Sequence, residues 1–348
     1  MGKRTTTVDI SRKLGVATST VVRALNGSAG VGAETRKMIQ DMAREMDYQS
    51  NRSAKSLSRK TIKIGFIQPE QLSVYHDEIQ KGIKSAHSEI ADFNVALTCC
   101  VSTSDSNKYR RNLIKALNDM ADDGYSGFII IPSKDHSGLY ECIDKLADRG
   151  IAVAIVSGDM PFSRRAFCVC LDGKVAGRIA SELLCWFTGG AQTAIFTGHE
   201  HMKGNIVEII DGFQETNVTN GLREAYIYDN YDDFDLAYLN TGKLFREHPE
   251  VKGIYIGSAN TIPVCRRLEE LGLAGEVKVV ASDCYPELAQ LIRERVVHAS
   301  IFQDPFRQGR IAMKEMFRCI DEGIKPGEQF LTVQPTIILR SNLESFIS

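Results

Sequence analysis

Nine short apolar runs, rich in Val and Ile, alternate with helical stretches over residues 61–348 of this 348-residue chain. Near-continuous apolar runs bounded by Gly, Pro or Ser are typical of parallel strands that helices cover on both faces of a sheet. The alternation therefore predicts a doubly wound α/β fold for this part of the chain. The predicted strands are residues 62–67, 95–101, 128–131, 151–156, 193–196, 225–228, 253–256, 277–281 and 299–302.

So many strands favour two sheets over one, and hence two subdomains. In open α/β sheets, ligands bind beyond the carboxyl ends of the strands. We therefore expect a small-molecule site in a cleft between the two subdomains.

The first 60 residues have a different pattern, which predicts three short helices. Thr7 can cap the first helix, and Gly15 can end it in a left-handed conformation. A second helix follows a three-residue turn and stops at Asn26-Gly27, and a third covers residues 33–46. Two short helices with a tight turn, braced by a third, are typical of a helix-turn-helix unit.

Charge separates the same two parts of the chain. Residues 1–60 contain 12 Lys and Arg against five Asp and Glu, a net charge of +7, whereas the whole chain has −2 and the remainder therefore −9. A basic head on an acidic body is typical of nucleic-acid binding by the head.

The order of residues in this head resembles the DNA-binding headpiece of the lactose-repressor (LacI/GalR) family. The segments that carry the resemblance are 7–10, 14–16, 20–27, 34–36 and 48–57. The resemblance implies that the second helix lies in the major groove, where an arginine can contact guanine through two hydrogen bonds. The same resemblance implies that Thr18, Ser19 and Arg23 contact bases and that Thr20 belongs to the same surface. It also implies that Asn26 and Thr35 contact phosphates.

Residues 50–60 resemble the hinge of that family, which folds on operator DNA. The implied DNA contacts here are Asn51, Ala54, Lys55 and Leu57. Leu57 would be the apolar wedge that opens a base step from the minor groove. The alternative is that Leu57 is an ordinary linker residue.

Three residues of the head depart from the family pattern. Ala17 and Gly32 stand where the family has Ser as helix caps, and Val22 stands where it has a phosphate-binding Ser. The loss of a cap weakens a helix by about 1 kcal/mol. We expect weaker backbone contacts to DNA, with Thr18 partly replacing the cap at Ala17.

The body resembles the periplasmic-binding-protein-like effector domain of the same family and of sugar-binding transport proteins. The predicted fold is thus a small all-α helix-turn-helix headpiece (1–49) and a hinge (50–60) followed by an α/β periplasmic-binding-protein-like body of two doubly wound subdomains (61–348). The resemblance implies crossings near 168, 303 and 331. These crossings give an N-subdomain of 61–168 and 303–330 and a C-subdomain of 169–302 and 331–348, which together bind effector and dimerise.

Polar residues at strand ends are the candidate effector contacts. Asn260, Asp283 and Gln303 match polar ligand contacts of the family, and amides and carboxylates suit the hydroxyls of a sugar or polyol. Further candidates are Tyr75, His76, Asp159 and Asp172. For Asp172 and Asp283 the alternative is that each caps the helix after its strand. Ser157 replaces a family Asp, and a ligand-binding Arg of the second subdomain has no counterpart, which argues against a hexose bound in the usual way.

The residues and the resemblance together predict a DNA-binding transcription regulator, a repressor, controlled by a small carbohydrate-like effector. The expected partners are operator DNA, the effector and a second copy of the chain. No cofactor or metal is predicted, because His199 and His201 lack further spaced ligands and better fit a loop. Nine cysteines without metal-like spacing and the lack of a long apolar run favour a cytoplasmic protein with reduced thiols and no membrane contact.

Two other functions fit the body alone. A transport-type sugar-binding protein would need a secretory signal, whereas residues 1–7 lead into polar helix signals, and it would not need a basic head. An enzyme on the same fold would need a catalytic constellation, and the sequence has neither a phosphate-binding loop motif nor a nucleophile elbow.

Overall fold

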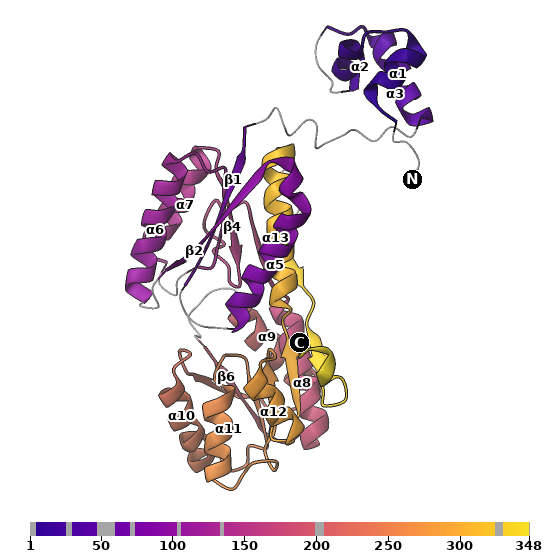
Figure 1. The fold of residues 1–348 in the computed structure, drawn as a ribbon. Helices are drawn as coiled ribbons and strands as arrows, with labels where there is room; N and C mark the ends of the chain where they lie inside the picture. Colours follow the sequence, from indigo (N-terminus) through magenta and orange to yellow (C-terminus); the bar gives the residue numbers. More distant parts are fainter. Residues whose placement is uncertain are drawn as a thin grey trace. The chain divides into compact units, whose positions relative to one another are not determined.

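The structure is a computed structural model that describes residues 5–25, 30–46, 60–69, 74–102, 106–132, 136–198, 205–323 and 330–347 (Figure 1). The chain divides into two compact units near residue 61. We call them the head and the body and describe each by itself.

The head is a three-helix unit, as the sequence predicts. Its helices are α1 (Thr7–Leu14), α2 (Thr18–Leu25) and α3 (Ala33–Glu45). They enclose a small core, because the apolar residues recur at helical spacing on facing sides of the helices. The buried members of that core are Ile10, Val21, Ala24, Ile39 and Ala43.

The cap of α1 differs from the prediction. Thr6, not Thr7, precedes the helix, and its hydroxyl accepts a hydrogen bond from the Asp9 amide at 3.3 Å. The Asp9 carboxylate in turn accepts from the Thr6 amide at 2.9 Å, so the two residues form a capping box. Gly15 ends the helix with a φ of 65°, as expected.

The other two helices of the head begin without a side-chain cap. Gly32 precedes α3 and makes no cap bond, and at α2 only the Ala17 carbonyl receives the amides of the first turn. The Thr18 hydroxyl donates instead to the Ser11 hydroxyl at 3.1 Å, which ties α2 to α1. A hydroxyl that donates can still accept, so the partial replacement of the cap by Thr18 stays a prediction.

The body contains two six-stranded sheets. All strand pairs of the first sheet are parallel, in the order β11-β5-β4-β3-β1-β2. Its strands are β1 (Ile62–Pro69), β2 (Val95–Ser102), β3 (Gly127–Ile130), β4 (Ala152–Val156), β5 (Phe167–Leu171) and β11 (Phe330–Val333). Its helices are α5 (Val74–Ile90), α6 (Ser106–Asp122), α7 (Leu139–Asp148) and α13 (Pro305–Glu322).

The second sheet has the order β12-β10-β9-β8-β6-β7, and only β12 runs antiparallel to its neighbour. Its strands are β6 (Thr193–Thr197), β7 (Tyr226–Asp229), β8 (Gly253–Ile256), β9 (Lys278–Ser282), β10 (Ala299–Phe302) and β12 (Thr336–Ile338). Its helices are α8 (Gly173–Thr188), α9 (Asn205–Thr219), α10 (Phe234–Glu247), α11 (Thr261–Glu270) and α12 (Pro286–Arg293). The 3₁₀ turns Ala91–Phe93 and Leu343–Ser345 complete the regular structure.

The doubly wound prediction and its nine strands are confirmed, and the structure adds β5, β11 and β12. The chain crosses between the sheets after β5, β10 and β11. The first and third crossings fall a few residues later than the predicted boundaries at 168 and 330. The reason is that β5 continues to Leu171 and pairs there with β11, which itself continues to Val333.

Two helix pairs in the body cross at glycines, one pair in each subdomain. In the pair α8 and α9, a Cβ on Gly177 would lie 2.0 Å from the Ile209 carbonyl oxygen, so only glycine permits this approach. The pair α5 and α13 has the same design, since a Cβ on Gly82 would lie 2.0 Å from the Phe306 carbonyl oxygen.

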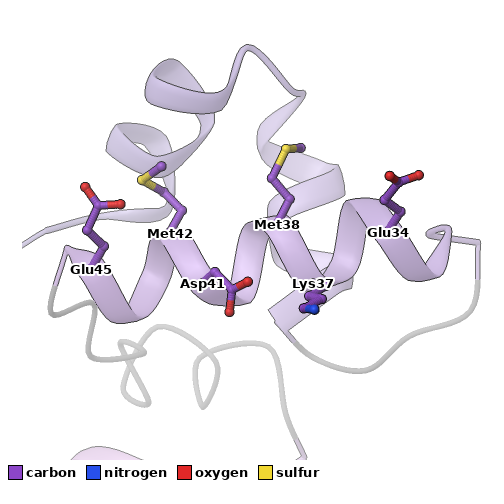
Figure 2. Close-up of a pocket in the computed structure, with 6 residues that line it drawn as sticks. All are labelled: Glu34, Lys37, Met38, Asp41, Met42 and Glu45. Atoms are coloured by element: carbon purple, nitrogen blue, oxygen red, sulfur yellow. The ribbon is translucent and has the colours of Figure 1, made fainter.

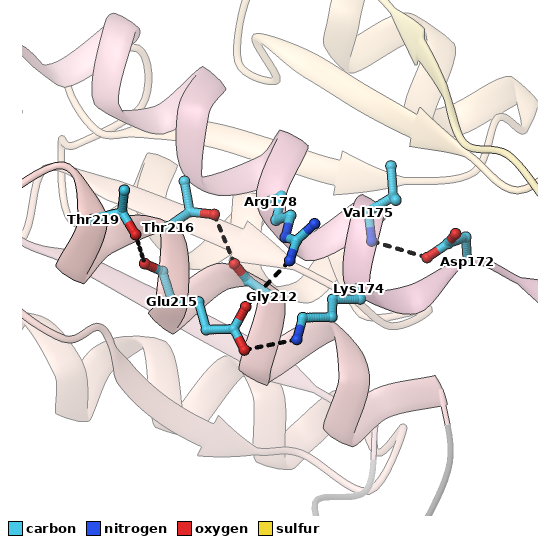
Figure 3. Close-up of polar contacts among 8 residues, drawn as sticks. All are labelled: Asp172, Lys174, Val175, Arg178, Gly212, Glu215, Thr216 and Thr219. Carbon is cyan, nitrogen blue, oxygen red and sulfur yellow. Dashed lines mark hydrogen bonds and ion pairs between the residues drawn. The ribbon is translucent and has the colours of Figure 1, made fainter.

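Each crossing is flanked by a glutamate held between two cations of the partner helix. Figure 3 shows Glu215 of α9 with Lys174 and Arg178 of α8, at 2.7 and 3.4 Å. In the other pair, Arg310 and Lys314 of α13 hold Glu89 of α5 at 2.6 and 2.7 Å. These exposed ion pairs add little energy, so the close backbone approach is what fixes the helix packing.

The close crossing of α8 and α9 predicts that one added methyl group strongly destabilises the fold. Gly177→Ala should lower the free energy of unfolding by at least about 1–3 kcal/mol, because the methyl group meets backbone that cannot move aside. Gly242→Ala, in the middle of α10, is the matched control, since its methyl group meets only the flexible end of Arg267. Urea unfolding of both variants measures the difference, and equal stabilities would contradict the packing account.

Candidate functional site

The exposed face of α2 is the candidate DNA-reading surface. Ser19 and Arg23 are exposed and lie one turn apart, while Thr18 and Thr20 are half-buried at its edges. Thr35 is half-buried in the first turn of α3. The predicted contacts Asn26, Asn51, Ala54, Lys55 and Leu57 lie outside the described residues.

The outer face of α3, in contrast to α2, is rich in acidic side chains. Figure 2 shows its side chains along a shallow pocket with three carboxylates and one ammonium group. These residues are Glu34, Lys37, Met38, Asp41, Met42 and Glu45. Such a face repels phosphate, whereas α2 contains no acidic residue. The charge distribution within the head therefore favours α2 as the side that meets DNA.

A second candidate site lies at the carboxyl ends of the strands in the body. Its residues come from the end of β1, the first turn of α5, and the loops that follow β8, β9 and β10. We call this group the interdomain site, and it consists of Gln68, Tyr75, His76, Asn260, Asp283 and Gln303. Five of the six were predicted as effector contacts, and Gln68 was not.

Hydrogen bonds join the two subdomains at this site. The Gln303 amide donates to Asp283 Oδ2 at 3.0 Å, and the Gln308 amide donates to the Gln303 carbonyl at 2.8 Å and to the Tyr75 hydroxyl at 3.0 Å. Sequence reasoning missed Gln308, which is fully buried in the first turns of α13. Its only signal was a Gln one turn after the Asp304-Pro305 helix start.

Asp283 is held in an unusual conformation. Its φ is 70°, and its backbone is fixed by a bond from its amide to the Ile301 carbonyl and by the Ser300 hydroxyl on its carbonyl at 2.6 Å. Ser157, which follows β4, also has a positive φ, of 67°. Strained backbone of this kind persists where the surrounding structure requires it and is common at ligand sites.

Burial raises the pKa of the Asp283 carboxyl to about 7, although the hydrogen bonds from Gln303 oppose the shift. Burial also lowers the pKa of His76 to about 4, so this imidazole is neutral at neutral pH. The interdomain site therefore offers neutral hydrogen-bonding groups and one carboxyl that titrates near neutrality.

Several polar atoms of this region are buried and have no hydrogen-bond partner within the described residues. Each such atom costs free energy, roughly 1–3 kcal/mol, unless something binds it. Asn260 is the clearest case, because it is fully buried and neither its Oδ1 nor its Nδ2 is bonded. The others at these strand ends include Gln68 Oε1, His76 Nδ1, Ser258 Oγ and Asp283 Oδ1. This concentration of unbonded atoms indicates a ligand site.

Two predicted candidates have structural partners instead. Asp159 is buried in a two-pronged ion pair with Arg165, at 2.5 and 2.9 Å, so the structure does not bring its carboxylate into the interdomain site. Asp172 caps α8 by accepting from the Val175 amide at 3.1 Å, as Figure 3 shows. Asp283, by contrast, caps no helix, because Tyr285 stands at the start of α12. The capping alternative therefore holds for Asp172 and is wrong for Asp283.

No group of three potential metal ligands occurs among the described residues. His199 and His201 lie outside them. In the described part of the chain, no helix has the length and apolar character to cross a bilayer.

Comparison with known proteins separates the same two parts. Residues 64–324 match the periplasmic binding protein domain family, and residues 6–51 match the lacI family of bacterial regulatory proteins. The chain is 23% identical over 315 residues to catabolite control protein A of Priestia megaterium, covering 89% of this chain and 90% of that protein. It is 25% identical over 240 residues to the HTH-type transcriptional regulator pepR1 of Lactobacillus delbrueckii subsp. lactis, covering 68% of each.

Among solved structures, the fold is similar to a glucose-galactose binding protein from Geobacillus stearothermophilus. That match has a TM-score of 0.72 and 21% identity and covers 82% of this chain and 99% of the other. An arabinose binding protein from the same organism matches with a TM-score of 0.71 and 17% identity, over 83% of this chain and 100% of the other.

The two family matches cover the head and the body in the order in which they follow one another along the chain. The fold predicted from the strand pattern and the resemblance seen in the head are both confirmed. The chain belongs to the LacI family of bacterial transcription regulators, with a helix-turn-helix head followed by a periplasmic-binding-protein body.

Proposed function

We propose that this protein is a repressor that binds a palindromic operator as a homodimer and that a small polyhydroxy compound in the interdomain site changes its operator affinity. The observation that carries the effector half of this proposal is Asn260, a fully buried amide with both polar atoms unbonded within the described residues. An amide donates and accepts at once, as a sugar hydroxyl does.

The other groups of the interdomain site support a neutral ligand. Gln68 Oε1 accepts, and the neutral His76 and the hydroxyl of Ser258 can each donate or accept. The buried cation Arg165 is already neutralised by Asp159. The similarity of the body to glucose-galactose and arabinose binding proteins points to the same chemical class.

A ligand at this site would contact both subdomains. Gln68, Tyr75 and His76 belong to the first, and Asn260 and Asp283 belong to the second. Binding therefore favours the arrangement of the subdomains in which both sets of groups reach the ligand. The effect on DNA follows if operator binding favours a different arrangement, which is a population shift between two states. No catalytic residue is part of the proposal, and the operator partner implies a cytoplasmic location.

The DNA-reading surface predicts a specificity defect. Arg23→Ala should weaken binding to an operator selected in vitro by about 1–3 kcal/mol more than binding to random duplex, because it removes a contact to a base. Lys37→Ala, on the acidic face of α3, is the control and should change neither affinity by a comparable amount. Fluorescence anisotropy at one fixed salt concentration gives both affinities, and equal losses on both duplexes for Arg23→Ala would reject the assignment.

The unbonded amide of Asn260 predicts that its removal abolishes the effector response with little change in stability. Asn260→Ala should leave the free energy of unfolding within about 1 kcal/mol of the wild type, because the amide bonds no group in the described part of the chain. It should abolish the thermal stabilisation by an effector found in a panel of D-glucose, D-galactose, D-arabinose and D-ribose.

Asn217→Ala is the matched control. Asn217 is also buried, but it bonds Ser181 at 2.7 Å and the Arg223 carbonyl at 3.0 Å, so its loss should cost about 1–3 kcal/mol. This variant should keep the response to the effector. A response retained in Asn260→Ala would remove Asn260 from the effector site.

A further inference from the structure

Asp283 contains the carboxyl group at the centre of the interdomain site. Its Oδ2 accepts a hydrogen bond from the Gln303 amide at 3.0 Å, whereas its Oδ1 is buried and has no partner within the described residues. A carboxylate carries its charge on both oxygens. The side-chain and backbone amides of Gln303 lower the pKa of this carboxyl, but they do not outweigh the loss of hydration on burial. The protein's own groups therefore do not support the charged form of this side chain.

The titratable groups that face Asp283 are three tyrosines and a cysteine. They are Tyr75 of α5, Tyr255 of β8, and Cys284 and Tyr285 of the loop before α12. Burial raises the pKa of Tyr255 and of Tyr285 to about 12 and raises the pKa of Tyr75 and of Cys284 above their ordinary values.

All four groups are therefore uncharged at neutral pH. The nearby cation Arg293 pairs with Glu344 at 3.0 Å. No cation of the described body forms an ion pair with Asp283, which leaves ionisation of its carboxyl unsupported until a donor arrives from outside the protein.

We propose, resting on the proposed function of the interdomain site, that Asp283 exchanges its proton for the effector. When only the protein's own groups face it, the side chain is a neutral carboxylic acid. When an effector hydroxyl donates a hydrogen bond to Oδ1, the Asp283 O–H bond breaks, its proton passes to solvent, and the carboxylate accepts the effector's hydrogen bond. The effector is thus selected for a hydrogen-bond donor at this position, and its affinity depends on pH.

The direction of this dependence follows from linkage. The unliganded group has a pKa of about 7, and a bound donor lowers it. Effector affinity therefore rises with pH below about 7, by up to about tenfold for each pH unit, and becomes constant above it.

The proposal is tested on the full chain without any effector. In the unfolded chain the carboxyl has the ordinary pKa of an aspartate, so between about pH 4 and 7 the unfolded state has lost a proton that the folded state keeps. Wild type should therefore lose stability relative to Asp283→Asn as pH rises, by about tenfold in the folding equilibrium constant for each pH unit. Above pH 7 the difference should be constant. Urea unfolding at several pH values measures it, and a difference that does not vary with pH would overturn the proposal.

A second measurement covers the case in which Asp283→Asn does not fold. Infrared spectra of the wild type should show the C=O band of a protonated carboxyl at about pH 6, and the band should disappear by about pH 8. Asp283→Ser should lack this band. Glu208→Gln is the control that should keep it, because burial and the neighbouring Asp172 raise the pKa of Glu208 as well. Absence of an Asp283-dependent band would contradict the inference, while the operator and Asn260 experiments would still decide the proposed function.

Discussion

The structure of the body depends on a conflict between burial and hydrogen bonding at the ends of its strands. Parallel strands covered on both faces end in loops whose polar side chains lie between two subdomains, where water is largely excluded. There, Asn260 and Asp283 have buried oxygens with no hydrogen-bond partner among the described residues, and Asp283 also has a left-handed backbone. Buried polar groups without partners and strained backbone are costly, and their concentration at this edge of the sheets is what makes it the candidate ligand site.

Closely packed helix pairs support the interdomain site. In each subdomain two helices approach so closely that a glycine faces the backbone of its partner, at Gly177 and at Gly82. In α13, a Cβ on Gly309 would likewise lie 2.1 Å from the Ile79 carbonyl oxygen of α5. Gln308, the residue before it, bonds Tyr75 and Gln303, and Gln303 in turn bonds Asp283. Helix packing, the crossing between sheets and the polar site thus involve consecutive parts of one segment of the chain.

The sequence predicted the strands and the helix-turn-helix head well, because apolar periodicity and the order of headpiece residues are local signals. The sequence predicted the roles of polar side chains less well, because those roles depend on partners elsewhere in the chain. Asp159 follows a strand and looks like a ligand contact, but Arg165 neutralises it. Gln308 looks like an ordinary helix residue, and its role depends on Tyr75, which lies far away in sequence. The predicted cap of α1, Thr7, is one residue away from the observed cap, Thr6. Three successive threonines, Thr5 to Thr7, offer the same hydroxyl, and only the position of Asp9 selects among them.

In the proposed function, the interdomain site and the DNA-reading surface act on one conformational equilibrium. Linkage requires that an effector change operator affinity by the same factor by which operator DNA changes effector affinity. The most direct measurement is a pair of titrations of the full chain at one salt concentration, operator with and without saturating effector, and effector with and without saturating operator. Coupling of the two sites predicts one common factor different from unity in both titrations, and Asn260→Ala should abolish it in both. An operator affinity that is unchanged by a bound effector would contradict this coupling.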